Sequence, residues 1–233
     1  MKYQIKEFEK NILYYETAKR QLETYITAIN NEFEVIEDYN PINHITTRIK
    51  SIESIVGKLK RKNLTISLKN AEKLTDIVGA RIIVDFIENI YEIINKIKAN
   101  KNIEIVEERD YITKPKVSGY RAYHLIVLIP VSIDGINKDI YCEIQIRTIA
   151  MDFWATNEHK LNYKTNNHDL VYQKKWQETA KKVWDLDKSM NELFLEKKKN
   201  NIKHDKNRLN IELSFLKSID KFGKLKRLGD TSG

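Results

Sequence analysis

The chain has 233 residues, of which 41% are hydrophobic and 9% aromatic, a composition typical of a globular rather than a disordered protein. It contains no apolar run of about 18 residues and no signal-peptide pattern, so we expect no membrane segment and a cytoplasmic location. The single cysteine, Cys142, excludes an internal disulfide and a cysteine cluster for metal. A formal net charge of +8 predicts a positive field that attracts polyanions, whether nucleotides, RNA or an acidic partner.

Residues 1–40 are expected to form an N-terminal helical extension. Their apolar residues recur at mixed three- and four-residue spacing, which predicts an amphipathic helix over residues 3–37. The stripe consists of Ile12, Tyr15, Leu22, Ile26, Ile29 and Phe33. The polar face mixes both charge signs, which favours packing on a core over binding to a membrane surface.

A short strand and a basic helix follow Pro41. Residues 45–50 read as a strand, and Ser51 or Ser54 can cap the next helix. The apolar stripe of that helix carries Ile52, Ile55, Val56 and Leu59, and its other positions carry Lys58, Lys60, Arg61 and Lys62. From the pattern alone, these cations are most simply a solvated face.

Asp76 introduces a buried strand over residues 76–84. A carboxylate at the start of a strand, beside a basic cluster, is well placed to hold a magnesium ion between polyphosphate oxygens. The alternative is a turn aspartate that caps the local backbone. Further along, the sequence predicts a helix over residues 86–99, a strand over 103–111 and a lysine-rich turn over 113–118.

The stretch Gly119–Lys164 organises the rest of the chain. It predicts two strands around a turn at Asp134-Gly135, followed by a tryptophan-bearing helix over residues 151–163. In the second strand the apolar side carries Cys142, Ile144 and Ile146, and the polar side carries Tyr141, Glu143, Gln145 and Arg147. The polar row is either a solvated edge or a ligand platform on a sheet, and we favour the platform.

Residues 168–220 are expected to form C-terminal helices, and residues 221–233 a flexible tail. Packing positions in these helices include Leu186, Met190 and Leu193. The segment also contains the dipeptides His168-Asp169 and His204-Asp205. Neither has companion metal ligands nearby in the sequence, so we interpret both as coincidental.

Three motifs carry a family resemblance: SGYRAYHLIV at 118–127, EIQIRT at 143–148 and FWATNEHKLNYK at 153–164. Together they resemble the synthetase domain of RelA/SpoT-type (p)ppGpp synthetases, in particular the small, single-domain alarmone synthetases of bacteria. The resemblance covers residues 41–164. It implies an α+β fold with a nucleotidyltransferase-like mixed β-sheet of about five strands flanked by helices, and a synthetase domain over residues 41–167.

The resemblance also implies how a metal and two substrates are held. The catalytic carboxylates and ligands of Mg²⁺ would be Asp76 and Glu143. The ATP side would consist of Arg48, Lys50, Ser54, Lys58 and Arg81. The side for GDP or GTP would consist of Lys114, Lys116, Tyr120, His124 and Gln145, with Tyr120 stacking on guanine. From the residues alone, His124 could equally be a satisfied core histidine, and the two lysines an exposed loop.

The implied reaction is pyrophosphoryl transfer, in which the 3′ hydroxyl of GDP or GTP attacks the β-phosphorus of ATP. AMP leaves, and ppGpp or pppGpp forms. Family members that also hydrolyse the product carry an N-terminal HD domain, and about forty residues ahead of the motifs are too few for one, so we expect synthesis only. Residues 107–110, EERD, depart from the R-x-K-D and E-x-D-D patterns of the long enzymes, so the choice between GDP and GTP stays open.

The resemblance implies a homotetramer built by the C-terminal helices with the first helix; by pattern alone, these helices could equally cover a monomer's sheet. Two other functions also stay open. An ordinary nucleotidyltransferase would carry Gly-Ser followed by a D-x-D pair, a combination that the sequence lacks. A non-enzymatic RNA-binding regulator would use the basic surface. Single-stranded RNA could also regulate a synthetase tetramer.

Overall fold

Five β-strands form one mixed sheet in the structure, a computed structural model that describes residues 2–37, 39–162 and 170–229. The strands are β1 (Ile42–Ile49), β2 (Val78–Val84), β3 (Glu104–Asp110), β4 (Tyr123–Ile133) and β5 (Ile136–Thr148). Their order is β1-β2-β5-β4-β3, with β2 and β5 parallel and the other neighbours antiparallel. The predicted α+β fold with a mixed sheet of about five strands is confirmed.

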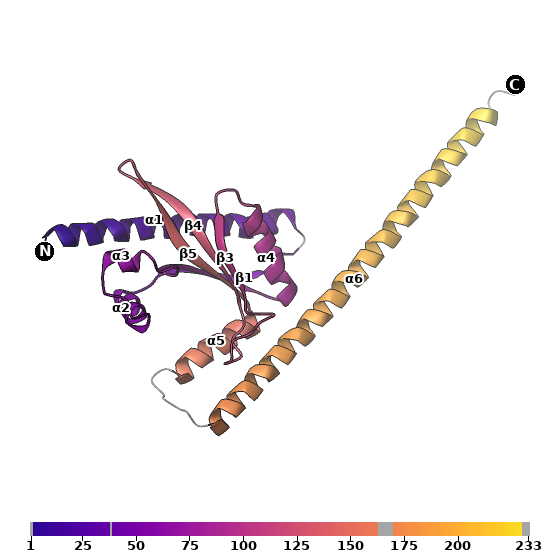
Figure 1. Ribbon diagram of the computed structural model, residues 1–233. Coiled ribbons are helices and arrows are strands. Elements are labelled where there is room, and N and C mark those ends of the chain that lie inside the picture. Colours follow the sequence, from indigo (N-terminus) through magenta and orange to yellow (C-terminus); the bar gives the residue numbers. More distant parts are fainter. Residues whose placement is uncertain (1, 38, 163–169, 230–233) are drawn as a thin grey trace. The chain divides into compact units, whose positions relative to one another are not determined.

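Helices α1 (Lys2–Ile36) and α4 (Ile87–Ala99) pack on the apolar face of this sheet (Figure 1). The core between them is made of fully buried aliphatic side chains, among them Leu22, Ile26, Ile90, Ile93, Leu125 and Ile144. Each such side chain contributes about 1.5–3 kcal/mol on burial. Because strand residues alternate between faces, the opposite face is left for polar side chains.

Helix α1 covers the predicted residues, but its buried stripe differs at the N-terminal end. Tyr14 and Ala18 are buried, whereas Ile12 is 41% exposed. Ile12 lies two residues before Tyr14, which places it on the opposite side of a helix with 3.6 residues per turn. The Tyr14 hydroxyl donates a hydrogen bond to the carbonyl oxygen of Ile136 at 3.3 Å, which ties α1 to the β4–β5 hairpin.

Helix α2 (Ile52–Arg61) begins after Ser51, whose side-chain oxygen accepts a hydrogen bond from the backbone N–H of Ser54, as the cap prediction requires. The sequence did not predict the short helix α3 (Leu68–Ala71) that follows. A second core cluster joins Leu59 of α2 to Leu74 and Ile77. This cluster holds α2 beside the turn that carries Asp76.

Helix α5 (Ile149–Asn162) follows β5 directly and begins two residues earlier than predicted. Thr148 connects it to the first part of α6 (Leu170–Gly229): its hydroxyl oxygen accepts from the Met151 N–H at 3.1 Å and donates to Asp187 Oδ2 at 2.6 Å. Burial raises the pKa of Asp187 to about 6, although the Thr148 hydrogen bond lowers it. The C-terminal end of β5 is therefore packed between two helices.

The chain divides into two compact units, Met1–Lys188 and Ser189–Gly233. The second unit is the remainder of α6, which is helical as far as Gly229. Three predicted packing positions of α6 are exposed in the single chain: Leu186 by 64%, Met190 by 46% and Leu193 by 59%. His168-Asp169 lies outside the described residues, and His204-Asp205 lies within α6.

Among the described residues, no helix has both the length and the apolar character needed to cross a membrane.

Two glycines with positive φ offer a matched test of how tightly α6 packs on the loop before β4. Gly119 has φ +81° and Gly135 has φ +71°. Replacing either glycine by alanine would introduce backbone strain of about 1–2 kcal/mol. A Cβ at Gly119 would also lie 2.3 Å from the Cβ of Ala180 in α6, whereas a Cβ at Gly135 would meet nothing within 4 Å. We expect Gly119→Ala to lower the free energy of unfolding by about 1–3 kcal/mol more than Gly135→Ala, measured by urea denaturation. Equal losses would contradict this packing.

Candidate functional site

The face of the sheet opposite α1 and α4 carries polar residues in two rows set by the strand register. Residues paired in register on neighbouring strands point to the same face. The first row consists of Arg48, Gly79 and Glu143, and the second of Thr46, Arg81, Gln145 and His124. Gly79 has no side chain, so the first row has a gap between Arg48 and Glu143.

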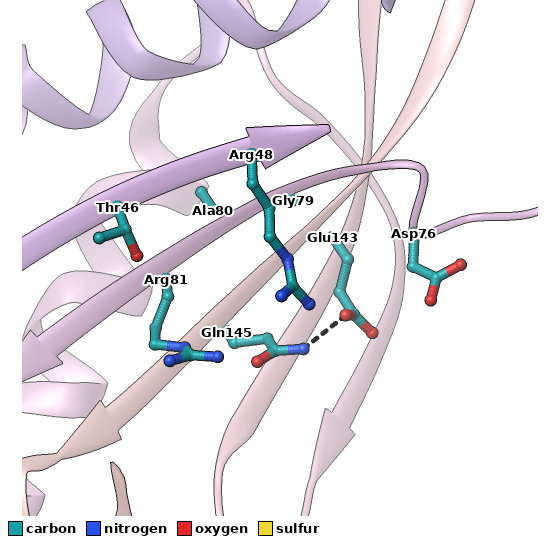
Figure 2. A pocket seen from close by; sticks show the side chains of 8 residues that line it. All are labelled: Thr46, Arg48, Asp76, Gly79, Ala80, Arg81, Glu143 and Gln145. Carbon is teal, nitrogen blue, oxygen red and sulfur yellow. Dashed lines mark hydrogen bonds between the residues drawn. The ribbon is translucent and has the colours of Figure 1, made fainter. Parts of the chain in front are cut away.

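A pocket of about 160 Å³ includes this gap (Figure 2). It is lined by Thr46, Arg48, Asp76, Gly79, Ala80, Arg81, Glu143 and Gln145. Predicted site residues from three segments that are distant in the sequence, at 48, 76–81 and 143–145, therefore converge on one cavity. The parallel pairing of β2 with β5 brings the last two segments together.

Asp76 lies in the turn just before β2 and is held by two cations. Lys50 binds Asp76 Oδ2 from the end of β1, and Lys58 Nζ of α2 lies 2.7 Å from the same oxygen. Burial raises the pKa of Asp76, but the hydrogen bonds and charges of the two lysines outweigh it and lower the pKa below its usual range. The other oxygen, Oδ1, is buried and has no hydrogen-bond partner among the described residues.

Glu143 lies mid-strand on β5 and is also held ionised. His124 Nδ1 lies 3.1 Å from Oε1, and the Gln145 amide donates to Oε2 at 2.6 Å. Burial raises the pKa of Glu143, but hydrogen bonds from His124 and Gln145 and the charges of His124 and Lys58 bring it down to about 2. Glu143 is thus a strong hydrogen-bond acceptor and a weak base.

These two carboxylates fit a hard divalent cation. Mg²⁺ is bound in proteins by one or two carboxylates and completes its shell with phosphate oxygens and water. Asp76 Oδ1 is a buried oxygen in need of a positive partner, and ionised Glu143 lines the same pocket. The donor set is therefore chemically suited to Mg²⁺.

Arginines give the opposite side of the pocket its positive charge. Arg48 and Arg81 both line it, and Arg81 Nη1 pairs with Asp152 Oδ1 of α5 at 3.2 Å. Burial, and after it the charge of Arg147, lower the pKa of Arg81. Such crowding of guanidinium groups favours a polyanionic ligand, because phosphate oxygens relieve their mutual repulsion.

Tyr120 and His124 lie beside Glu143, but Tyr120 is not on the strand where it was expected. Strand β4 begins at Tyr123, and Tyr120 lies in the segment before it, which is neither helix nor strand. The Tyr120 hydroxyl is 2.7 Å from His124 Nε2, so the two side chains lie on the same side of the sheet. The Lys116 ammonium lies 4.7 Å from the centre of the Tyr120 ring and 4.8 Å from that of Tyr111.

Seven predicted site residues do not line the pocket: Lys50, Lys58, Lys116, Tyr120 and His124, whose contacts are described above, and Ser54 and Lys114. Ser54 is exposed near the start of α2, where its hydroxyl contacts that of Ser51 at 3.1 Å. Lys114 is exposed in the turn before Gly119. Their proposed contacts therefore depend on how far a bound nucleotide extends from the pocket.

Sequence reasoning missed two members of this site. Asp152, in the first turn of α5, pairs with both Arg81 and Arg147. Arg147 was expected in the polar row but as an outward-facing residue, and it is only 5% exposed. The alternating pattern could have identified Arg147; no comparable signal marked Asp152, because its place depends on how α5 folds back from β5.

The chain is similar in sequence to known proteins over the segments that carry this site. The family model described as "Region found in RelA / SpoT proteins" matches residues 47–168. The chain is 44% identical over 164 residues to the GTP pyrophosphokinase YwaC of Bacillus subtilis, covering 70% of this chain and 78% of the relative. It is 38% identical over 189 residues to the GTP pyrophosphokinase YjbM of the same organism, covering 81% and 89%.

Solved structures of similar proteins have the same fold as this chain. The small alarmone synthetase 1 of Bacillus subtilis bound to its product pppGpp superposes with a TM-score of 0.75 at 38% identity, covering 82% of this chain and 98% of that one. The small alarmone synthetase 2 of the same organism gives a TM-score of 0.73 at 40% identity, covering 82% and 99%. On these matches, the chain belongs to the RelA/SpoT family, in its branch of small alarmone synthetases.

Proposed function

We propose that the pocket transfers the pyrophosphoryl group of ATP to the 3′ hydroxyl of GDP or GTP, so that the chain is a GTP/GDP pyrophosphokinase producing ppGpp or pppGpp and AMP. The observation that carries this is the convergence of two ionised carboxylates and several cations on one cavity. Phosphoryl-transfer sites need this combination, because they work by alignment and charge neutralisation more than by covalent chemistry. The names of the relatives agree with it.

On the donor side, Arg48 and Arg81 are placed to bind the ATP phosphates and to stack on its base. Guanidinium groups suit both tasks because they are planar and donate forked hydrogen bonds. Lys50 and Lys58, which hold Asp76, add mobile charge at the same end of the pocket. Ser54 and Lys114 would contact the parts of the nucleotides that extend beyond the cavity.

Asp76 and Glu143 would hold a magnesium ion, which would neutralise polyphosphate charge and favour departure of AMP. Glu143 also accepts a hydrogen bond from the attacking 3′ hydroxyl and orients it. Its low pKa makes proton removal before attack unfavourable, so the proton passes to Glu143 only as the new P–O bond forms and is then released to water, while AMP departs with the electron pair of the broken P–O bond.

On the acceptor side, the guanine ring stacks on Tyr120. Lys116 covers this ring in the free protein, so the lysine moves aside when the base binds and is then free to contact the 5′ phosphates. Base stacking on an aromatic side chain is worth about 1–3 kcal/mol in single-strand complexes, which offsets the loss of this cation–π contact. Gln145 and His124 complete the acceptor side next to Glu143.

A homotetramer remains a proposal. Support comes from apolar side chains that a single chain leaves in water: Ile149 and Phe153 are 50% and 61% exposed, one turn apart on α5. A role for single-stranded RNA as a regulator rests only on the net positive charge.

The direct test is product formation from ATP, Mg²⁺ and either GDP or GTP, resolved by ion-exchange chromatography. We expect the wild-type chain to form ppGpp or pppGpp with stoichiometric AMP. Glu143→Gln and Asp76→Asn should each lose at least about a hundredfold in kcat, because each removes a metal ligand. Asp139→Asn, at an exposed position on the same strand, should match the wild type.

Absence of product from folded wild-type protein with both acceptors would overturn the proposed function and favour a non-enzymatic regulator. Full activity in both site variants would overturn the assignment of the carboxylates.

Lys58 offers a second test with a neighbouring control. Lys58 contacts Asp76, whereas Lys60 on the same helix is exposed. A hydrogen bond between charged groups contributes about 1.5–3 kcal/mol, so Lys58→Gln should raise the KM for ATP about tenfold or more. Lys60→Gln should change it less than about twofold. Steady-state kinetics with varied ATP separates the cases, and equal effects would argue against a specific donor-side role for Lys58.

A further inference from the structure

Asp152, in the first turn of α5, forms ion pairs with arginines that lie on the two sides of the proposed site. Its Oδ1 lies 3.2 Å from Arg81 Nη1 and accepts a hydrogen bond from Arg147 Nη1 at 3.0 Å. Arg81 lines the pocket and belongs to the proposed ATP side. Arg147 lies next to the acceptor side, and the preceding proposal gives no role to Arg147 or to Asp152. One carboxylate oxygen is therefore shared between the two sides.

Arg147 connects this shared oxygen to the tyrosine on which guanine is proposed to stack. Its Nη2 donates to the Tyr120 hydroxyl at 2.7 Å, and its guanidinium carbon lies 5.1 Å from the centre of the Tyr120 ring. The same Nη2 donates to Gln145 Oε1 at 2.6 Å. Because the guanidinium group contacts both the hydroxyl and the ring, the position of Arg147 contributes to the position of the Tyr120 ring.

The two ion pairs of Asp152 differ in their exposure to water. The side chain of Arg81 is 33% exposed, whereas that of Arg147 is 6% exposed. Burial and the charge of Arg147 lower the pKa of Arg81, and the charge of Asp152 raises it, so Asp152 offsets the repulsion between the two guanidinium groups. Solvent screens an exposed pair more than a buried one. The pair with Arg81 is therefore the one that a ligand can more easily replace.

A bound polyphosphate would change how Asp152 is shared. Phosphate oxygens beside Arg81 compete with the carboxylate for the guanidinium donors, because arginine binds phosphate and carboxylate with the same forked geometry. The Asp152 oxygen is then left to Arg147, and their hydrogen bond strengthens because it is no longer divided between two donors. A more firmly held Arg147 restricts the Tyr120 ring before guanine arrives. Such preorganisation reduces the entropy lost on binding.

We propose that Asp152 is a positioning residue that couples the two substrate sites, so that bound ATP tightens the binding of GDP or GTP. This inference rests on the proposed function of the pocket. The element with two arrangements is Arg81, which pairs with Asp152 in the free protein and exchanges it for phosphate when ATP binds. Coupling between two binding sites is reciprocal, so the acceptor nucleotide tightens the binding of ATP by the same factor.

The test measures binding to the full chain without turnover. An ATP analogue with a methylene bridge between its α and β phosphorus atoms lacks the bond that the proposed reaction breaks. Isothermal titration calorimetry in the presence of Mg²⁺ gives the Kd of GDP with and without a saturating concentration of this analogue. We expect the analogue to lower the Kd of GDP about fivefold or more in the wild type. Saturating GDP should lower the Kd of the analogue by the same factor.

Two variants separate the charge of Asp152 from its place in the fold. Asp152→Asn keeps an oxygen that can accept from Arg147 but removes the shared charge, so the analogue should change the Kd of GDP less than about twofold. A merely structural role would weaken GDP binding equally with and without the analogue. Arg81→Gln should leave Asp152 to Arg147, so GDP should bind this variant alone about as tightly as it binds the wild type with the analogue.

Asp139→Asn, the same substitution at an exposed position of β5, is the matched control and should show the wild-type coupling. The Arg81→Gln result stands by itself if Asp152→Asn does not fold.

Equal Kd values of GDP with and without the analogue in the wild type would overturn the inference, and so would full coupling in Asp152→Asn. GDP binding to Arg81→Gln that is no tighter than to the wild type alone would contradict the exchange of partners. If both nucleotides bind without coupling, the proposed function stands and only this inference fails. If neither nucleotide binds the folded wild type, the proposed function fails and the inference fails with it.

Discussion

The parallel pairing of β2 with β5 is the constraint on which the site depends. It places Gly79 opposite Glu143 and Arg81 opposite Gln145, so the segment that begins at Asp76 faces the polar row of β5. A shift of one residue in this register would turn Glu143 and Gln145 into the apolar core and expose the isoleucines. The buried packing of α1 and α4 on the other face therefore fixes the position of the chemistry: the same aliphatic side chains that stabilise the sheet determine which carboxylate meets which cation.

The two carboxylates are kept ionised by different means. Asp76 is surrounded by mobile lysine charge and retains one buried oxygen without a partner, which suits a metal that arrives with ATP. Glu143 is held by His124 and Gln145, which lie on the same sheet, and this suits a group that must keep one orientation while the acceptor hydroxyl attacks. Both arrangements stabilise negative charge in the free protein, so little reorganisation is needed when the polyphosphate binds.

The sequence predicted secondary structure best where its residues follow a recognisable local pattern. Alternation over residues 141–147 predicted β5 and its polar face, and the cap at Ser51 placed α2. Predictions were less accurate for residues whose environment depends on packing between segments that are distant in the sequence. Ile12 was placed in the core because spacing alone does not fix which turn of α1 meets the sheet. Arg147 was placed in the polar row but was given no role in the site, because its partners Tyr120 and Asp152 come from other segments, whose approach no local pattern encodes.

The central claim is that Asp76 and Glu143 form one metal site over the Gly79 gap. Electron paramagnetic resonance of Mn²⁺, used in place of Mg²⁺ with a non-hydrolysable ATP analogue, measures occupancy of that site without requiring turnover. The account predicts that Asp76→Asn and Glu143→Gln each weaken bound Mn²⁺ by about tenfold or more. Unchanged Mn²⁺ affinity in both variants would contradict it and place the metal elsewhere on the polyphosphate.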